Sequence, residues 1–213
     1  MMGTLTEECY IYIYLGFQKP VSASHYAEIM TAGFKQHALK LLSNYPPDFS
    51  KTDQRDIMAT VATRWVFGCS SRNFFEIVIN MTNGKAADQS YLYAFDFPLD
   101  FPGWGDNLAF CNTHVCHGSD IVYTFDSSDR NFTSTGRQIS QSHMFYWSNF
   151  AKYSSPNAPQ SAASSSSSNS FINWPSYSMK TKPFLRFVRP SNTVESGYLR
   201  SECNFFDSIG YIF

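Results

Sequence analysis

Residues 111–120, Cys-Asn-Thr-His-Val-Cys-His-Gly-Ser-Asp, form the densest group of reactive side chains in the sequence. One interpretation is a zinc site, for which four ligands are present: Cys111, His114, Cys116 and His117. A second is a small disulfide between the two cysteines beside two loop histidines, and a third makes one of these histidines a general base. The short span argues against zinc, because structural zinc sites usually take ligand pairs from two separate segments.

The elements that must position this stretch are predicted from hydrophobic spacing and turn residues. Aromatic side chains alternate along residues 91–97, which predicts a strand with one very apolar face. A loop rich in proline and glycine follows and carries Phe101 and Trp104. The predicted elements are, in chain order, helices over 24–42 and 53–79, the latter broken near Gly68 or Ser70–Ser71, a strand over 91–97, a helix over 136–153, a strand over 184–188 and a helix over 194–209.

The composition describes a folded globular body rather than a disordered chain. The 213 residues include only 15% charged and as many as 17% aromatic side chains, and the aromatic rings demand burial. A net charge of −1 lacks the basic character expected of a nucleic-acid-binding protein. No apolar run approaches the length of a membrane span.

Cysteines and glycosylation motifs point in a different direction from the N-terminus. The five cysteines leave at least one thiol unpaired, and N-x-[ST] motifs occur at Asn80 and Asn131. These features favour a secretory protein, whereas residues 1–8 have neither the basic nor the apolar region of a signal peptide. The protein is therefore either cytosolic with free thiols or has its true N-terminus upstream.

Residues 154–173 form a serine-rich tract that includes five consecutive serines, Ser164 to Ser168. Such a composition cannot bury a core, so we expect a disordered surface insertion. The whole chain, residues 1–213, is expected to form one partial domain that contains this insertion.

Several motifs, in the same order along the chain, resemble the type-B carboxylesterases, the cholinesterase-like branch of the α/β-hydrolase fold. The segment 117–125 resembles the family's H-G-x-[ED]-x-x-[YF]-x-F motif, and the resemblance covers nearly the whole chain. The other matching segments are Gly3-Thr4-Leu5-Thr6-Glu7-Glu8, Tyr91-Leu92-Tyr93-Ala94-Phe95, Tyr146-Trp147-Ser148-Asn149-Phe150-Ala151, Trp174-Pro175-Ser176-Tyr177 and Cys203-Asn204-Phe205-Phe206-Asp207.

This resemblance assigns roles to residues by position. Glu8 matches the acid of the catalytic triad and His117 its base, an assignment that suits a histidine pKa near 6.5 and a carboxylate that fixes its tautomer. Glu7 is the competing acid, and His114 is the competing histidine, although it lacks the following glycine. The resemblance also pairs Cys69 with Cys203 and Cys111 with Cys116, which leaves Cys9 single, at a position where the family usually has glycine.

The catalytic serine is what the sequence lacks. None of its glycines begins a G-x-S-x-G nucleophile motif, and no HGGG-like oxyanion motif is present. We therefore interpret the chain as the incomplete C-terminal part of an α/β-hydrolase, mostly helical with a few sheet strands. The strand that delivers the acid is expected to be absent, and the isolated chain to be inactive and prone to aggregate.

Two functions remain open at this point. The full-length protein is a secreted serine esterase that acts on small carboxylic esters, or it is a catalytically dead relative with an adhesion, storage or partner-binding role. Serine esterase chemistry needs neither a cofactor nor a metal, so none is expected. Phe101 and Trp104 are candidates for lining a substrate gorge, with simple packing as the alternative. Neither the acyl preference nor the oligomeric state follows from this sequence.

Overall fold

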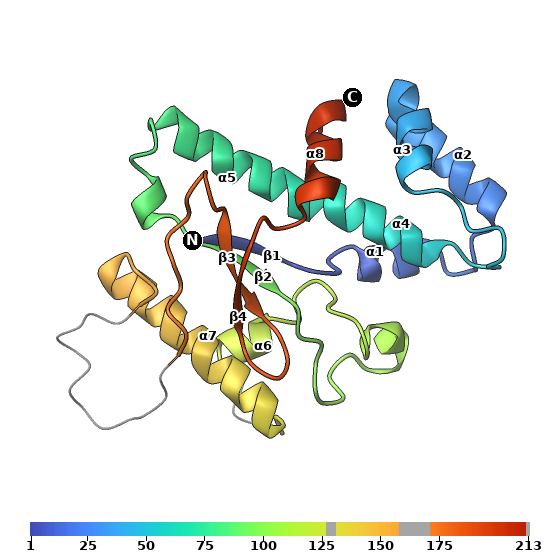
Figure 1. Cartoon of the computed structure of the whole chain (residues 1–213). Coiled ribbons are helices and arrows are strands. Elements are labelled where there is room, and N and C mark those ends of the chain that lie inside the picture. Colours follow the sequence, from blue (N-terminus) through green and yellow to red (C-terminus); the bar gives the residue numbers. More distant parts are fainter. Residues whose placement is uncertain (127–130, 158–170, 212–213) are drawn as a thin grey trace.

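The protein was analysed as a computed structural model that describes residues 1–126, 131–157 and 171–211. A four-stranded sheet lies between helices, with strand order β1-β2-β3-β4 (Figure 1). Strand β2 is parallel to both β1 and β3, whereas β4 is antiparallel to β3. The strands are β1 (Met2–Leu5), β2 (Leu92–Phe95), β3 (Pro183–Phe187) and β4 (Thr193–Ser196).

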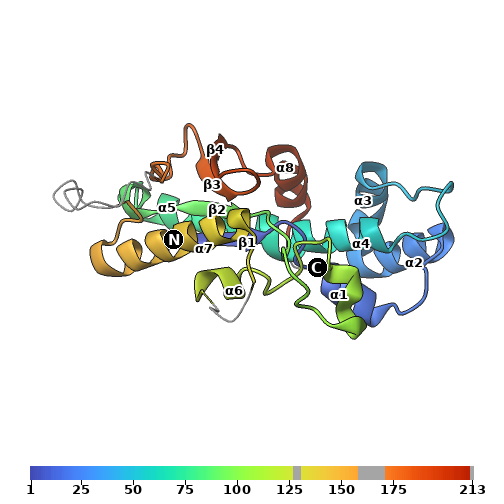
Figure 2. The same cartoon turned by 90° about the horizontal axis from the view of Figure 1, so that it is seen from below.

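Helices precede, separate and follow the strands. Those of the described residues are α1 (Tyr10–Gly16), α2 (Ala23–Phe34), α3 (Ala38–Asn44), α4 (Arg55–Ala62), α5 (Cys69–Met81), α6 (Ile121–Thr124), α7 (Ser134–Tyr153) and α8 (Arg200–Ile209). Shorter 3₁₀ turns cover Lys35–His37, Ala87–Gln89 and Asp106–Cys111, and Thr63–Gly68 is a π-helical segment. Helices α2 and α3 lie at the end of the molecule away from α7 (Figure 2).

The alternation of side chains along β2 explains why the sheet needs helices on both faces. Tyr91, Phe95 and Phe97 belong to the core that also contains Tyr146 of α7. Leu92 and Ala94 point to the opposite core, which includes Phe75 and Ile79 of α5. Successive residues of a strand face opposite sides, and both sides of β2 are apolar. The aromatic face predicted for residues 91–97 is therefore the face that α7 covers.

Two sequence predictions about strands are wrong. Residues 2–5 do form the strand that leads to the acid, paired in parallel with β2. Gly3 lies opposite Tyr93, where a Cβ atom would come within 2.3 Å of the ring, so only glycine leaves room for it. The helix predicted over 194–209 begins only at Arg200, because Thr193–Ser196 pairs with β3 and Gly197 takes a φ of 73°.

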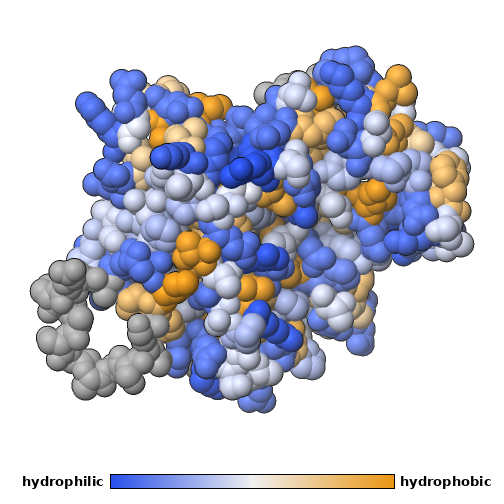
Figure 3. Space-filling model, viewed as in Figure 1, coloured by the Kyte–Doolittle hydropathy of each residue, from blue (hydrophilic) through white to orange (hydrophobic). Residues whose placement is uncertain are grey.

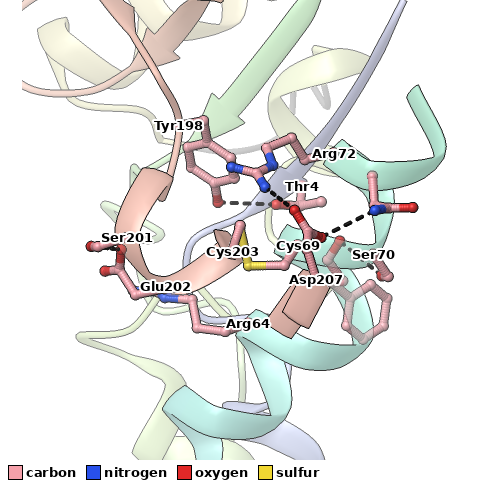
Figure 4. The surroundings of a disulfide bond; sticks show 12 residues. Thr4, Arg64, Cys69, Ser70, Arg72, Tyr198, Ser201, Glu202, Cys203 and Asp207 are labelled. Carbon is pink, nitrogen blue, oxygen red and sulfur yellow. Dashed lines mark hydrogen bonds and ion pairs between the residues drawn. A yellow bond between two sulfur atoms is a disulfide. The ribbon is translucent and has the colours of Figure 1, made fainter. Parts of the chain in front are cut away.

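The long helical stretch predicted over 53–79 is continuous rather than broken. Helix α4 passes through the π-helical segment Thr63–Gly68 directly into α5. A disulfide between Cys69 and Cys203 fastens this rod to α8, and beside it Arg72 forms an ion pair with Asp207 (Figure 4). Both half-cystines are fully buried, in the core shared by α2, α3, α4 and α8.

The serine-rich tract is described only at its two ends, since residues 158–170 lie outside the described residues. The prediction of disorder there is therefore not addressed. At the base of the tract, the Asn157 side chain accepts from the Trp174 N–H (2.9 Å) and donates to its carbonyl (2.8 Å). The Trp174 ring is fully buried and donates its Nε1–H to the carbonyl of Leu92. The two ends of the tract are thus held together on the sheet.

Some surfaces remain apolar. Hydrophobic side chains are exposed on the face seen in Figure 3, including over α2 and α3. On α5, four exposed residues share one helical face: Phe74, Ile77, Val78 and Met81. In the described part of the chain, no strand pairs with the outer edge of β1. Both features agree with the expectation that the isolated chain aggregates. None of the described helices is both long and apolar enough to cross a bilayer.

Candidate active site

Two adjacent carboxylates, Glu7 and Glu8, emerge directly after β1. The backbone is fixed on both sides of them. The Thr6 N–H donates to the carbonyl of Phe95 (3.0 Å), and the Cys9 N–H donates to Thr63 Oγ1 (2.9 Å). The acids therefore lie at the carboxyl end of a parallel strand, where functional groups of α/β folds gather.

The histidines lie in the loop between β2 and α6. The Cys111–Cys116 disulfide, with a sequence separation of 5, closes this loop, and both sulfur atoms are buried. The chain turns directly after His117, where Gly118 takes a φ of 85°, a conformation that favours glycine. Two short-range features thus determine the path of the loop before the chain enters α6.

Glu8 and His117 form a hydrogen-bonded pair. Glu8 Oε2 lies 2.5 Å from His117 Nδ1, and Glu8 Oε1 accepts the Leu5 N–H at 2.9 Å. The Glu8 side chain is 5% exposed, whereas the His117 side chain is 47% exposed. An ionised carboxylate accepts, so Nδ1 carries the proton and Nε2 is the basic nitrogen. In the described part of the chain, no group hydrogen-bonds to Nε2.

Aromatic rings and a third acid surround this pair. The His117 ring centroid lies 5.5 Å from that of Tyr12 on α1 and 5.6 Å from that of Phe67. Burial, and then the charge of Glu8, raises the pKa of the Asp120 carboxyl above its ordinary value. Sequence reasoning missed the two rings. Tyr12 lies on α1, which was not predicted, and Phe67 lies within the helical stretch predicted over 53–79, whose contact with His117 depends on tertiary packing.

Glu7 and His114 form a second pair next to the first. Glu7 Oε1 lies 2.9 Å from His114 Nδ1, and Glu7 Oε2 accepts the Val115 N–H at 2.7 Å. The His114 ring stacks on Tyr10 with centroids 3.6 Å apart. The structure therefore joins each histidine to a different glutamate, so the alternatives considered from sequence are two separate pairs.

Two cavities of the described residues adjoin the second pair. One of about 280 Å³ is lined by Glu7, His114 and Arg64, and another of about 500 Å³ by Glu7, Arg64 and Asp96. His117 lines neither, and its ring is open at the surface of this chain. A substrate pocket around His117 would need further walls.

The other candidate residues fall in several places. Phe101 packs on Phe132, and Trp104 packs against the cluster around Tyr10. Asn80 and Asn131 are exposed.

Cys9 is a buried free thiol. Burial raises its pKa to about 11, so it is protonated at neutral pH. Among the described residues, no group of three or more potential metal ligands exists, and Cys111 and Cys116 are bonded to each other.

Known proteins resemble this chain in sequence and in fold. It is 25% identical over 165 residues to the crystal protein of Dictyostelium discoideum, a match that covers 75% of this chain and 28% of that protein. The cAMP-regulated D2 protein of the same organism is 26% identical over 160 residues, covering 74% and 29% respectively. A thermophilic PNB esterase shares the fold, with a TM-score of 0.60 and 16% identity over 95% of this chain and 37% of its own.

The chain thus spans less than two fifths of the length of each of these proteins. The match to the esterase supports a partial α/β-hydrolase fold. The model of the carboxylesterase family matches residues 15–206, which include His117 but begin after Glu8. Because that match covers most of the sequence, the chain belongs to the carboxylesterase family.

Proposed function

We propose that this chain supplies the acid and the base of a serine esterase, with Glu8 as the acid and His117 as the base. The observation that carries the proposal is the short contact between a buried Glu8 carboxylate and Nδ1 of a half-exposed His117. Family membership adds support, since it was established independently of that contact. Glu7 and His114 are less suited, because Glu7 is 37% exposed and His114 is stacked beneath Tyr10.

In the proposed reaction, a serine outside this chain attacks the carbonyl carbon of a carboxylic ester. His117 Nε2 takes the hydroxyl proton as the Oγ–C bond forms, and the carboxylate of Glu8 stabilises the resulting imidazolium. The same proton then passes to the alkoxide oxygen as its bond to the carbonyl carbon breaks. The alcohol departs, and the acyl group remains on the serine as an acyl-enzyme. Water, activated by Nε2 in turn, releases the carboxylic acid and restores the serine. The steps need no metal or cofactor.

We further propose that the full-length protein enters the secretory pathway. Two buried disulfides support this, because such bonds persist in oxidising compartments. Asn80 and Asn131 are exposed within N-x-[ST] motifs, as glycosylation requires. The mass of the native protein before and after deglycosylation tests entry into the secretory pathway. A decrease in mass supports it, and an unchanged mass contradicts it.

Hydrolysis of a short-chain p-nitrophenyl ester by the native protein tests the esterase. We expect turnover that His117→Ala abolishes and His25→Ala, at an exposed site on α2, leaves unchanged. Turnover equal in both variants contradicts the proposal.

A catalytically dead, esterase-like protein with an adhesion, storage or partner-binding role is the second candidate. The observation that favours it is the similarity to the crystal protein and the cAMP-regulated D2 protein, neither of which is named as an esterase. A folded native protein that neither hydrolyses esters nor reacts with a serine-directed reagent would establish this second candidate.

A further inference from the structure

We propose that Glu7 is a positioning residue for His117, acting through the loop that carries the histidine. This inference rests on the proposed function, in which His117 is the base. Among the described residues, Glu7 forms no hydrogen bond with His117. Its two carboxylate oxygens hold His114 Nδ1 and the Val115 N–H, which lie three and two residues before His117 respectively.

The need for a second carboxylate follows from how Glu8 is used. One Glu8 oxygen is engaged by the Leu5 N–H at the end of β1, so a single oxygen remains for His117. A single hydrogen bond fixes the position of Nδ1 but leaves the ring free to swing about it. His117 is half-exposed, and packing restrains the ring only partly.

Glu7 restricts that movement by fixing the backbone. Val115 is 3% exposed and belongs to the main core, and its N–H donates to Glu7 Oε2 at 2.7 Å. The Cys116 sulfur next to it is tied to Cys111. The residues preceding His117 are thus held by a core contact, a disulfide and a charge-assisted hydrogen bond, the last of which is roughly twice as strong as a neutral one.

The second contact of Glu7 extends the restraint to the helices. His114 lies between Glu7 and the ring of Tyr10 on α1, with 3.6 Å between the ring centroids. The Tyr10 hydroxyl donates to Asp56 on α4 at 2.9 Å. The histidine loop is therefore connected through Glu7 and His114 to the helical rod, whereas the Glu8 side chain connects it to the end of β1.

The nuclear magnetic resonance signal of the proton on His117 Nδ1 tests this inference. A proton shared by an imidazole and a carboxylate resonates far downfield, and it is seen only while the ring stays in place and water is excluded. The spectrum is recorded on the native protein and on variants made in it. We expect a downfield signal in the unaltered protein that disappears in His117→Ala, which assigns it.

In Glu7→Ala, we expect this proton to exchange with water about tenfold faster or to be lost, the factor that corresponds to one charge-assisted hydrogen bond. Glu7→Gln keeps an acceptor for the Val115 N–H and should largely restore the signal. Glu28→Ala, at an exposed site on α2, is the matched control and should change nothing. Thermal unfolding of each variant separates this effect from a general loss of stability.

An unchanged signal in a folded Glu7→Ala variant overturns the inference, as does the absence of the signal from the unaltered protein. If Glu7→Ala does not fold, His114→Phe decides, because it removes only the contact with Glu7 Oε1. Faster exchange in that variant supports the inference, and unchanged exchange contradicts it. The signal does not depend on hydrolysis, so a protein that shows it but cleaves no ester would refute the proposed function alone.

Discussion

Two glutamate–histidine pairs of the same chemical type lie side by side in this molecule, built from the same two segments. They differ in how deeply the acid is buried. In Glu8–His117 the acid is 5% exposed and the histidine 47%, whereas in Glu7–His114 the values are 37% and 27%. A buried acid with an accessible base is suited to moving protons. An accessible acid with a histidine stacked on Tyr10 is suited to fixing a loop.

Removing each histidine in turn from the native protein should separate the roles of the two pairs. His117→Ala should lower kcat/KM for an ester by about 10⁶-fold, since it removes the proposed base. His114→Ala should cost about 100-fold at most, the effect of a misplaced group. The rate of ester hydrolysis at saturating and at limiting substrate concentrations measures the loss in each variant. Equal losses would mean that the two pairs do not have separate roles.

The two disulfides lie in different regions, one in the histidine loop and one between the helical rod and α8, so removing each in turn compares these regions. Replacing Cys69 and Cys203 by serine should destabilise the protein by roughly 5 kcal/mol, because the bond closes a loop of 134 residues. Replacing Cys111 and Cys116 should cost roughly 2 kcal/mol of stability. The loss of activity should follow the reverse order. Removing Cys111–Cys116 should lower activity more than removing Cys69–Cys203, because only the Cys111–Cys116 bond closes the loop that carries the histidines. Chemical unfolding and ester hydrolysis of both variants give the comparison, and the same order in both would contradict it.

A third histidine shows what burial does without a carboxylate. His143 is fully buried between aromatic rings, bonded to Thr124, and burial lowers its pKa to about 3. The unfolded chain therefore binds more protons between pH 6.5 and 3, so stability should fall as the pH decreases through that range. We expect a loss on the order of a few kcal/mol, which His143→Phe removes and the exposed His25→Ala does not. Urea unfolding at several pH values measures it, and a slope that persists in His143→Phe would be the contrary result.

The smallest expected effect acts on both pairs together. Gly3→Val places a side chain against Tyr93, so it should displace β1 and destabilise the protein by about 1–3 kcal/mol. Because Glu7 and Glu8 both follow β1, the downfield signal of His117 should weaken together with stability. A variant that loses stability but keeps that signal would show that the pairs are fixed independently of the strand.

The sequence predicted those parts in which a local pattern decides the structure. The aromatic alternation of residues 91–97 and the apolar spacing of 136–153 correspond to β2 and α7. Strand β1 was missed because a strand of four residues containing Gly3 has no pattern of its own and forms by pairing with β2. The helix over 194–199 was wrong because pairing with β3 and the positive φ of Gly197 override local helical spacing.

The candidate site was predictable only in part. Family resemblance indicated Glu8 and His117, which the chain brings to 2.5 Å across 109 positions. No spacing indicated that Glu7 would hold Val115 and His114, because that contact depends on how a loop 108 residues away folds back. Tyr12 and Phe67 were missed for the same reason. Side chains that act through tertiary contacts leave no local pattern in a sequence.

The proposed function requires Glu8 and His117 to activate a serine. Treating the native protein with a fluorophosphonate, which reacts covalently with an activated serine, tests this requirement. We expect a labelled polypeptide that contains peptides of this chain and is heavier than its 24.2 kDa, with labelling abolished by His117→Ala and retained in His114→Ala. A folded native protein that takes up no label, or that labels equally well without His117, would contradict it.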